Sequence, residues 1–195
     1  MSIRRVAITA AGLGLVALVV VGLVQLGSSR GSPSPSKLTL AQMRSRLMGS
    51  PAPLAALHAQ AGVLIGGGMP ALKARLAALH GRPVVINKWA SWCGPCRAEF
   101  GVFQRVSVKD GREVAFIGID SGDSHREATR FLKASPVSYP SYFDPGGGMG
   151  LAVSDSSFTP VTVFHGAHGG LFIHQGPYQS DAELEGDVVR YGLDA

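Results

Sequence analysis

The sequence predicts an α/β fold in which helices flank a central mixed β-sheet. Two apolar segments, 84–89 (VVINKW) and 114–119 (VAFIGI), are rich in residues that strands favour, and a helical segment separates them. Two further apolar segments, 161–164 and 171–174, are joined by a glycine-bearing loop, which predicts an antiparallel hairpin. Because a strand–helix–strand crossover predicts a parallel pair, the sheet is expected to be mixed.

The region before the first of these strands predicts two helices and one short strand. Residues 38–47 (LTLAQMRSRL) have the apolar spacing of an amphipathic helix, which we expect the prolines at positions 51 and 53 to end. The apolar triplet 63–65 (VLI) predicts a short strand that stops at three glycines. A second helix is expected from Pro70, a residue tolerated in a first turn, to the glycine at position 81.

The region after residue 90 predicts three more helices. The first begins near Pro95 and has phenylalanine and valine side chains at helical spacing. A serine followed three positions later by glutamate is a capping box, and it opens helices predicted for residues 124–133 and 180–191. The glycine-rich stretch 144–157 is expected to be irregular, with one helical turn around Leu151.

The N-terminal segment predicts a membrane anchor. Residues 6–26 contain no charged residue and are long enough to cross a bilayer as a helix, which takes about 20 apolar residues. Arg4 and Arg5 precede this segment, and a basic flank favours the cytoplasmic side. We therefore expect residues 1–26 to be a signal-anchor or transmembrane segment of a single-pass protein of the cell membrane, with the remainder outside the cytoplasm.

A second outcome remains open for the same segment. Gly27, Ser28 and Ser29 are small enough for a signal peptidase, and cleavage there would release a secreted protein. In both cases residues 27–36 (GSSRGSPSPS) have the composition of a flexible linker. Residues 37–195 are then the one folded, extracytoplasmic domain.

The charge distribution argues against nucleic-acid binding. The formal net charge is +5, but Arg4, Arg5 and Arg30 lie in residues 1–36, which contain no acidic residue. The remainder is close to neutral, and no stripe of basic residues interleaved with aromatics occurs in it. We therefore expect protein partners and no nucleic acid.

The only two cysteines, Cys93 and Cys96, stand three positions apart between a predicted strand and a predicted helix. A structural disulfide usually closes a long loop, and so small a ring constrains the unfolded chain very little. Two cysteines are too few for a four-cysteine zinc site, and a Cys2His2 site would require two distant histidines. The spacing therefore predicts a redox-active pair.

Helix position assigns different roles to the two cysteines. A cysteine at a helix N-terminus faces unpaired amide groups and the positive end of the helix dipole, which stabilise the reactive thiolate. Cys93 is therefore expected to attack a substrate disulfide, and Cys96 to resolve the mixed disulfide. Glu99, three residues further on, lies on the same helix face and is a candidate proton carrier for Cys96, unless it is an ordinary solvated charge.

The segment VVINKWASWCGPCRAEF, residues 84–100, resembles the active-site segment of the TlpA/ResA-like thioredoxin family, whose members are membrane-anchored thiol–disulfide oxidoreductases. The similarity extends through residues 115–120, from Tyr139 to Asp144, and through residues 158–164, and covers about residues 82–178. It implies a thioredoxin-like fold, an enzyme without cofactor or metal, client proteins with cysteine pairs, and a membrane redox partner that recycles the pair.

The resemblance also implies roles for individual residues. Cys93 and Cys96 carry the attacking and resolving roles, and Glu99 matches the acidic residue that follows the pair in this family. Pro160 matches a cis-proline beside the redox pair, with the backbone of Thr159 placed to pair with substrate. The expected substrate-binding surface consists of Trp92, Gly94, Pro95, Thr159 and Pro160.

Three residues depart from the family pattern. Asn87 stands where cytoplasmic thioredoxins have a buried aspartate, so proton transfer is expected to fall to Glu99 or to water. Lys88 replaces the usual aromatic residue of that strand, and Gly101 replaces a proline in the following helix. Thr159 also occurs before the proline of more oxidising relatives, which leaves the direction of electron flow open.

Four functions remain to be compared. The first is a reductant of disulfides in client proteins, such as the haem-attachment cysteines of apocytochromes, and it is favoured by the thioredoxin-type Gly94-Pro95 spacer. The second is an oxidant that introduces disulfides, as the oxidising compartment suggests. A thiol peroxidase is disfavoured because no isolated cysteine is present. A non-catalytic metal carrier would use His165, His168 and His174 with the cysteines.

Overall fold

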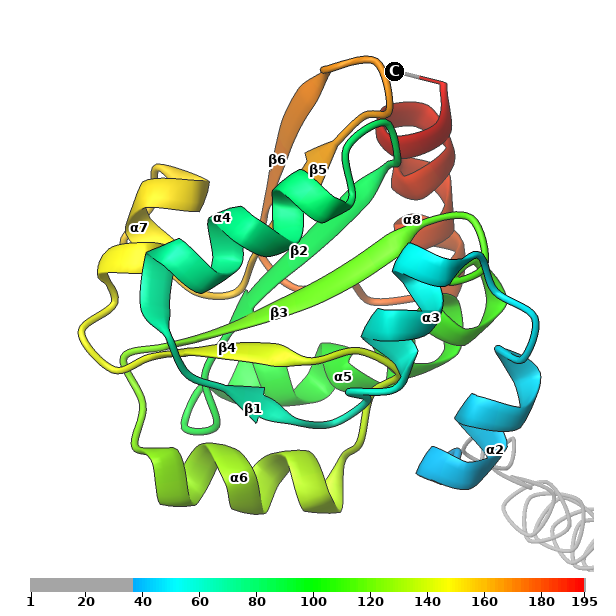
Figure 1. The fold of residues 1–195 in the computed structure, drawn as a ribbon. Helices are drawn as coiled ribbons and strands as arrows, with labels where there is room; N and C mark the ends of the chain where they lie inside the picture. Colours follow the sequence, from blue (N-terminus) through cyan, green and yellow to red (C-terminus); the bar gives the residue numbers. More distant parts are fainter. Residues whose placement is uncertain (1–36, 195) are drawn as a thin grey trace, which may run out of the picture. The chain divides into compact units, whose positions relative to one another are not determined.

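The computed structural model describes residues 37–194, and the predicted membrane segment and linker lie outside the described residues. The described part contains a six-stranded sheet in the order β1-β4-β3-β2-β5-β6 (Figure 1). The strands are β1 (Leu64–Ile65), β2 (Val84–Trp89), β3 (Ala115–Ser121), β4 (Ser141–Asp144), β5 (Val161–His165) and β6 (Leu171–Gln175). The helices are α2 (Leu40–Arg46), α3 (Ala52–His58), α4 (Gly68–Ala78), α5 (Gly94–Lys109), α6 (His125–Ala134), α7 (Gly148–Ser154), α8 (Asp181–Asp187) and the π-helix η1 (Val188–Leu193).

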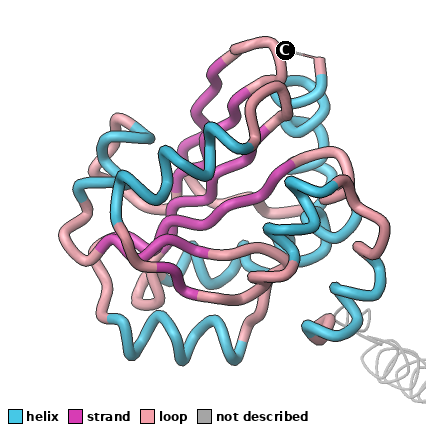
Figure 2. The backbone as a smooth tube through the Cα atoms, viewed as in Figure 1, coloured by secondary structure: helices cyan, strands magenta, loops and turns pink. Residues whose placement is uncertain are grey.

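Strand direction divides the sheet into two parts. β1, β4, β3 and β2 are parallel neighbours, whereas β5 pairs antiparallel with both β2 and β6. β2 and β3 are joined through α5, and β5 and β6 form the predicted hairpin, as the tube in Figure 2 shows. The prediction of a mixed sheet flanked by helices is confirmed.

Helices cover both faces of the sheet and enclose two cores. On one face, aromatic and aliphatic side chains of β2 and β3 pack against α5, α6 and the α8–η1 segment. On the other face, Ile86, Ile117 and Val163 pack against α3, α4 and α7. All residues of β2 and β3 are buried, which is expected for strands with helices on both sides.

Capping side chains account for the start of three helices, α2, α6 and α8. Ser124 caps α6 and Ser180 caps α8 by accepting from the amide of the third residue that follows, as their capping boxes predict. Thr39 caps α2 in the same way, and its box is completed by Gln42. The helix predicted for residues 38–47 is thereby confirmed.

Three short elements differ from the prediction. The helix α2 already ends at Arg46, and the two prolines instead begin α3, which was not predicted. Pro51 is the N-cap of α3, and Pro53 lies in its first turn, where a proline loses no helical hydrogen bond. The stretch 144–157 is more regular than expected, because α7 spans seven residues. β4 was not predicted, since a four-residue strand is defined by its pairing with β3 and β1.

Among residues 37–194, no helix is both long and apolar enough to cross a membrane.

Candidate redox-active site

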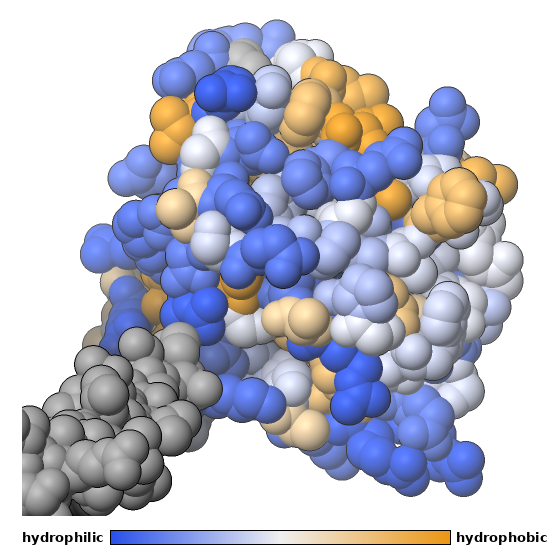
Figure 3. Space-filling view, turned by 180° about the vertical axis from the view of Figure 1, so that it is seen from behind, coloured by the Kyte–Doolittle hydropathy of each residue, from blue (hydrophilic) through white to orange (hydrophobic). Residues whose placement is uncertain are grey.

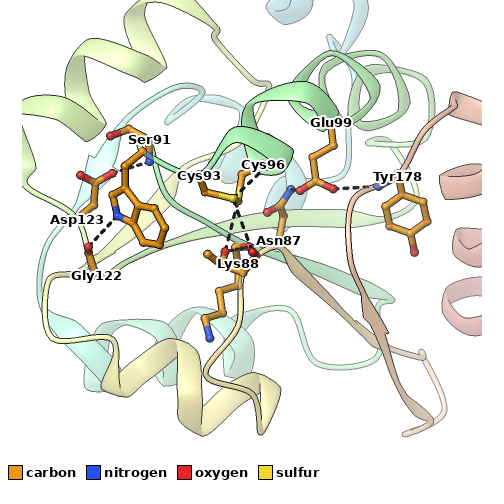
Figure 4. Close-up of a disulfide and its surroundings, with 11 residues drawn as sticks. Asn87, Lys88, Ser91, Cys93, Cys96, Glu99, Gly122, Asp123 and Tyr178 are labelled. Atoms are coloured by element: carbon orange, nitrogen blue, oxygen red, sulfur yellow. Dashed lines mark hydrogen bonds between the residues drawn. A yellow bond between two sulfur atoms is a disulfide. The ribbon is translucent and has the colours of Figure 1, made fainter.

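The two cysteines are joined by a disulfide at the N-terminus of α5, where β2 ends (Figure 4). The S–S distance is 2.07 Å. Cys93 is the N-cap, and its Sγ accepts from the backbone amide of Cys96 at 3.1 Å. The sulfur of Cys93 therefore occupies the place that a capping oxygen usually takes, where amide groups and the helix dipole stabilise negative charge.

Burial distinguishes the two sulfurs. Cys93 is 4% exposed and Cys96 is fully buried, whereas the spacer residues Gly94 and Pro95 are exposed. Of the two cysteines, only Cys93 therefore keeps any exposed surface. This asymmetry agrees with the predicted order, in which Cys93 reacts first and Cys96 second.

The segment before β5 lies against both sulfurs. The Thr159–Pro160 peptide bond is cis, as the family resemblance implied. The carbonyl oxygen of Thr159 is 3.7 Å from Cys93 Sγ, and its Oγ1 is 3.5 Å from Cys96 Sγ. The same hydroxyl donates to the carbonyl oxygen of Lys88 at 3.0 Å. The structure thus brings Thr159 and Pro160, predicted from sequence, to the redox pair.

Glu99 is fully buried one turn after Cys96 and is not a solvated charge. Its Oε1 accepts from Asn87 Nδ2 and its Oε2 accepts from the backbone amide of Tyr178, both at 3.1 Å (Figure 4). Burial raises the pKa of Glu99 to about 8, although these two hydrogen bonds act in the opposite direction. A carboxyl group with such a pKa can release and accept a proton near neutral pH.

Trp92 is 64% exposed, as expected for a docking residue, but its indole is held in place. Its Nε1 donates to the carbonyl oxygen of Gly122 at 3.0 Å. The amide of Ser91 donates to Oδ2 of Asp123 at 2.6 Å. The connection between β3 and α6 therefore supports the loop that leads to Cys93 from two sides.

A cavity of about 310 Å³ opens beside this loop, and Lys88, Trp92, Leu151 and Thr159 are among its lining residues. Leu151, which lines this cavity, and Phe158, which precedes Thr159, are exposed, at 50% and 74%. The face seen from behind is largely hydrophilic, with hydrophobic side chains gathered in a few areas (Figure 3). Trp92, Leu151 and Phe158 are three of the eight large hydrophobic residues that are exposed among residues 37–194.

Two buried ionisable residues near the site were not predicted to take part in it. Lys88 is 4% exposed, and its Nζ donates to the carbonyl oxygen of Ser156 at 2.5 Å. Burial lowers the pKa of Lys88, and the negative charge of Asp144 opposes that shift. Asp120 is fully buried at the end of β3, and burial, together with the nearby Asp123 and Asp144, raises its pKa to about 8. A charged residue inside an otherwise apolar strand segment is the sequence signal for both.

The histidines do not form the metal site that the carrier hypothesis requires. His165, at the end of β5, is half-buried, and His168 is exposed in the hairpin loop. His174 instead stacks on Tyr178 with ring centroids 4.1 Å apart, and its Nδ1 is 3.5 Å from Asp187. Among residues 37–194, no three His, Cys, Asp or Glu side chains are grouped closely enough to hold a metal ion.

Solved structures share this fold. The chain aligns with DsbF of MTB at a TM-score of 0.53 and 27% identity, covering 58% of this chain and 84% of that one. It aligns with a putative thiol:disulfide interchange protein DsbE of Chlorobium tepidum at a TM-score of 0.54 and 25% identity, covering 60% and 84%. These alignments confirm the predicted thioredoxin-like fold of the described domain.

Curated relatives share part of the sequence. The chain is 34% identical over 73 residues to thiol:disulfide interchange protein DsbE of Escherichia coli K12, which is 37% of this chain and 38% of the relative. It is 28% identical over 136 residues to DsbE of Yersinia pestis, covering 69% and 64%. The chain thus spans less than two thirds of the length of these relatives. The Redoxin family model matches residues 60–162, more than half of the chain, and with the cysteine pair and the fold in place, this chain belongs to the Redoxin family.

Proposed function

We propose that the protein is a thiol–disulfide oxidoreductase that exchanges a dithiol for a disulfide with client proteins through Cys93 and Cys96. The observation that carries this proposal is the disulfide at the N-terminus of α5, in which Cys93 is slightly exposed and Cys96 fully buried, with a buried acid one turn after Cys96. The similarity to proteins named thiol:disulfide interchange protein supports it.

In the reductive direction, the Cys93 thiolate attacks one sulfur of a client disulfide, and the other client sulfur leaves as a thiolate. Cys96 then loses its proton and attacks Cys93 Sγ in the mixed disulfide. The second client sulfur leaves, the Cys93–Cys96 disulfide forms, and two electrons have passed to the client. We propose that Glu99, in its ionised form and on the same helix, takes the proton of Cys96, directly or through water.

We further propose that the protein acts as a reductant. The Gly94-Pro95 spacer supports this direction, because thioredoxin, with a potential near about −270 mV, is a reductant. Haem-attachment cysteines of apocytochromes are the client class that we propose. The alternative, an oxidant of the same fold, is the other outcome of the test below.

The setting of this activity is also a proposal. The uncharged segment 6–26 with its basic flank supports an anchor in the cell membrane and an extracytoplasmic domain. A reductant in an oxidising compartment must itself be reduced again. We therefore propose a membrane redox partner that delivers electrons to the Cys93–Cys96 disulfide.

The decisive experiment is a redox titration of the full-length protein in detergent against glutathione buffers. A potential close to about −270 mV supports the reductant, whereas a value near about −120 mV, typical of strong oxidants, would replace it with the oxidant. The double variant Cys93→Ser, Cys96→Ser is the control, and it should show no exchange. Failure of the unmodified protein to exchange with glutathione or a disulfide-bonded protein contradicts the function itself.

A further inference from the structure

Lys88 is an unusual residue for its place in the fold. It lies in β2, between strands β3 and β5, and is almost fully buried although it carries an ammonium group. In Figure 4 its amino group points away from the disulfide, toward the face of the sheet that α7 covers. Burial of an ammonium group without hydrogen-bond partners costs free energy, so the partners of Lys88 must offset this cost.

The negative charge of Asp144, at the end of β4, acts on the Lys88 ammonium group, and two hydrogen bonds join Lys88 to one segment. The Lys88 ammonium group donates to the carbonyl oxygen of Ser156, and the Lys88 carbonyl oxygen accepts from Thr159 Oγ1 at 3.0 Å. Lys88 therefore binds the segment 156–159 at both of its ends. Thr159 in turn presents one oxygen to each sulfur of the redox pair, at 3.7 Å and 3.5 Å.

We propose that Lys88 is a positioning residue for thiol–disulfide exchange, which holds segment 156–159 so that the two oxygens of Thr159 face Cys93 and Cys96. This inference rests on the proposed function. It assigns to Lys88 an effect on the sulfurs that is transmitted through Thr159 and does not depend on contact with the substrate.

The chemistry of the reduced protein determines in which direction Lys88 shifts the pH at which the Cys93 thiolate forms. In the disulfide, neither sulfur has a hydrogen to donate. After reduction, the Cys93 thiol can donate to the Thr159 carbonyl oxygen, and the Cys96 thiol to Oγ1, whose own hydrogen is used by Lys88. A hydrogen bond donated by the neutral thiol favours that form over the thiolate. Loosening segment 156–159 therefore makes the Cys93 thiolate form at lower pH.

A role of Lys88 as a nearby positive charge would have the opposite sign. A cation stabilises a thiolate, so the loss of that charge would move thiolate formation to higher pH. The direction of the change thus separates positioning from simple electrostatics. A merely structural role would lower the free energy of unfolding without moving the pH profile in either direction.

Gly150 in α7 offers a second way to disturb the same contact. A Cβ atom at this position would lie 2.9 Å from Lys88 Cε and 2.7 Å from Ser121 Oγ. Gly150→Ala must therefore displace the Lys88 side chain while its charge is retained. It keeps the inference testable if the Lys88 variant does not fold.

The experiment measures the rate of Cys93 alkylation by iodoacetamide against pH in the reduced full-length protein, with urea unfolding to establish that each variant is folded. For Lys88→Met we expect the midpoint of the profile to fall by about half a pH unit, which is about threefold more thiolate at a pH below the midpoint. Lys73→Met, an exposed lysine of α4, is the matched control and should leave the midpoint unchanged.

An unchanged or raised midpoint in Lys88→Met overturns the inference. If that variant does not fold, Gly150→Ala is read in the same way, with a lowered midpoint supporting the inference and an unchanged or raised one overturning it. The failure of the proposed function is seen separately, because the unmodified protein would then not exchange with glutathione at all.

Discussion

At the scale of single residues, the site depends on side chains whose chemistry is changed by burial. Glu99 lies out of water between the Asn87 side chain and the Tyr178 amide, and its pKa is raised to about 8. Asn87 Oδ1 has no hydrogen-bond partner among the described residues. A glutamine at position 99 can therefore keep both contacts, because the amide of Asn87 can turn to offer its oxygen.

For Glu99→Gln we expect a folded protein that resolves mixed disulfides about 10²-fold more slowly, since proton transfer to a positioned group contributes about this much. The measurement is the rate of release of a model mixed disulfide at pH 7. Glu113→Gln, at an exposed acid after α5, is the control. A rate equal to that of the unmodified protein would show that water, and not Glu99, takes the proton.

Trp92 is the residue whose predicted role concerns the client alone. Its ring is exposed and makes one hydrogen bond, so Trp92→Ala should cost less than about 1 kcal/mol of stability. We expect kcat/KM for a protein client to fall about tenfold, as for an aromatic anchor of an interface. The glutathione equilibrium should not change. Leu171→Ala, an exposed residue of β6, is the control, and an equal loss in both variants would argue against docking at Trp92.

At the scale of elements, the redox loop is supported by the way α6 packs on the sheet. Phe131 of α6 lies 4.6 Å from Phe100 and 5.4 Å from Trp89 between ring centroids, so it joins α6 to α5 and β2. These rings pack edge-on or tilted, as aromatic side chains prefer.

Phe131→Ala removes this junction and should lower the free energy of unfolding by about 2 kcal/mol, less than for a fully buried phenylalanine. Urea denaturation followed by tryptophan fluorescence gives this value. Arg130→Ala, which breaks an exposed ion pair with Glu127 on the same helix, should change it by less than about 0.5 kcal/mol. If both substitutions lowered the free energy of unfolding by the same amount, the contacts of Phe131 with Phe100 and Trp89 would not contribute to stability.

Elements differ in how far the sequence predicts them. α6 and α8 could be predicted because each begins with a serine that caps its own helix, a signal confined to four residues. β4 could not, since its four residues become a strand only between β1 and β3. The same distinction holds in the site: the spacing of Cys93, Cys96 and Glu99 on one helix is local.

Other contacts of the site join residues far apart in the chain. Glu99 binds the amide of Tyr178 across a sequence separation of 79, and Lys88 reaches Ser156 across 68. Such contacts depend on the order of strands in the sheet. The redox role of the cysteines can therefore be predicted from the sequence, whereas the long-range contacts that influence their reactivity are known only from the fold.

At the scale of the whole molecule, buried acids connect the site to stability. Glu99 and Asp120 both have pKa values raised to about 8 by burial, from 4.5 and 3.8. Between pH 4.5 and about 8, these two carboxyl groups are therefore mostly protonated in the folded protein and mostly ionised in the unfolded chain. The stability from these groups is complete below the unfolded pKa and is lost as pH rises through about 8.

We expect the free energy of unfolding to fall between pH 6.5 and 8, by at most about 1.4 kcal/mol per pH unit for each group. Burial lowers the pKa of His58 and His165, which acts in the opposite direction, but only below about 6.5. Urea titrations across this window measure the slope, which Glu99→Gln and Asp120→Asn should each flatten. A slope that neither variant changes would assign the pH dependence to other groups.

The location of the domain can be tested because the whole chain contains only two cysteines, both in the redox site. After reduction of intact cells that express the full chain, a maleimide that does not cross membranes can label Cys93 only if the domain lies outside the cytoplasm. We expect labelling without permeabilisation, and none in the Cys93→Ser, Cys96→Ser variant. Labelling that requires permeabilisation would contradict export.

The labelled chain also separates the two outcomes that its N-terminus leaves open. An uncleaved anchor predicts a labelled protein of 20.3 kDa in the membrane fraction. Cleavage after residues 27–29 predicts a shorter labelled protein that is released when the outer layers of the cell are removed. For the reductant that we propose, a retained anchor would also keep Cys93 close to the proposed membrane partner that reduces it.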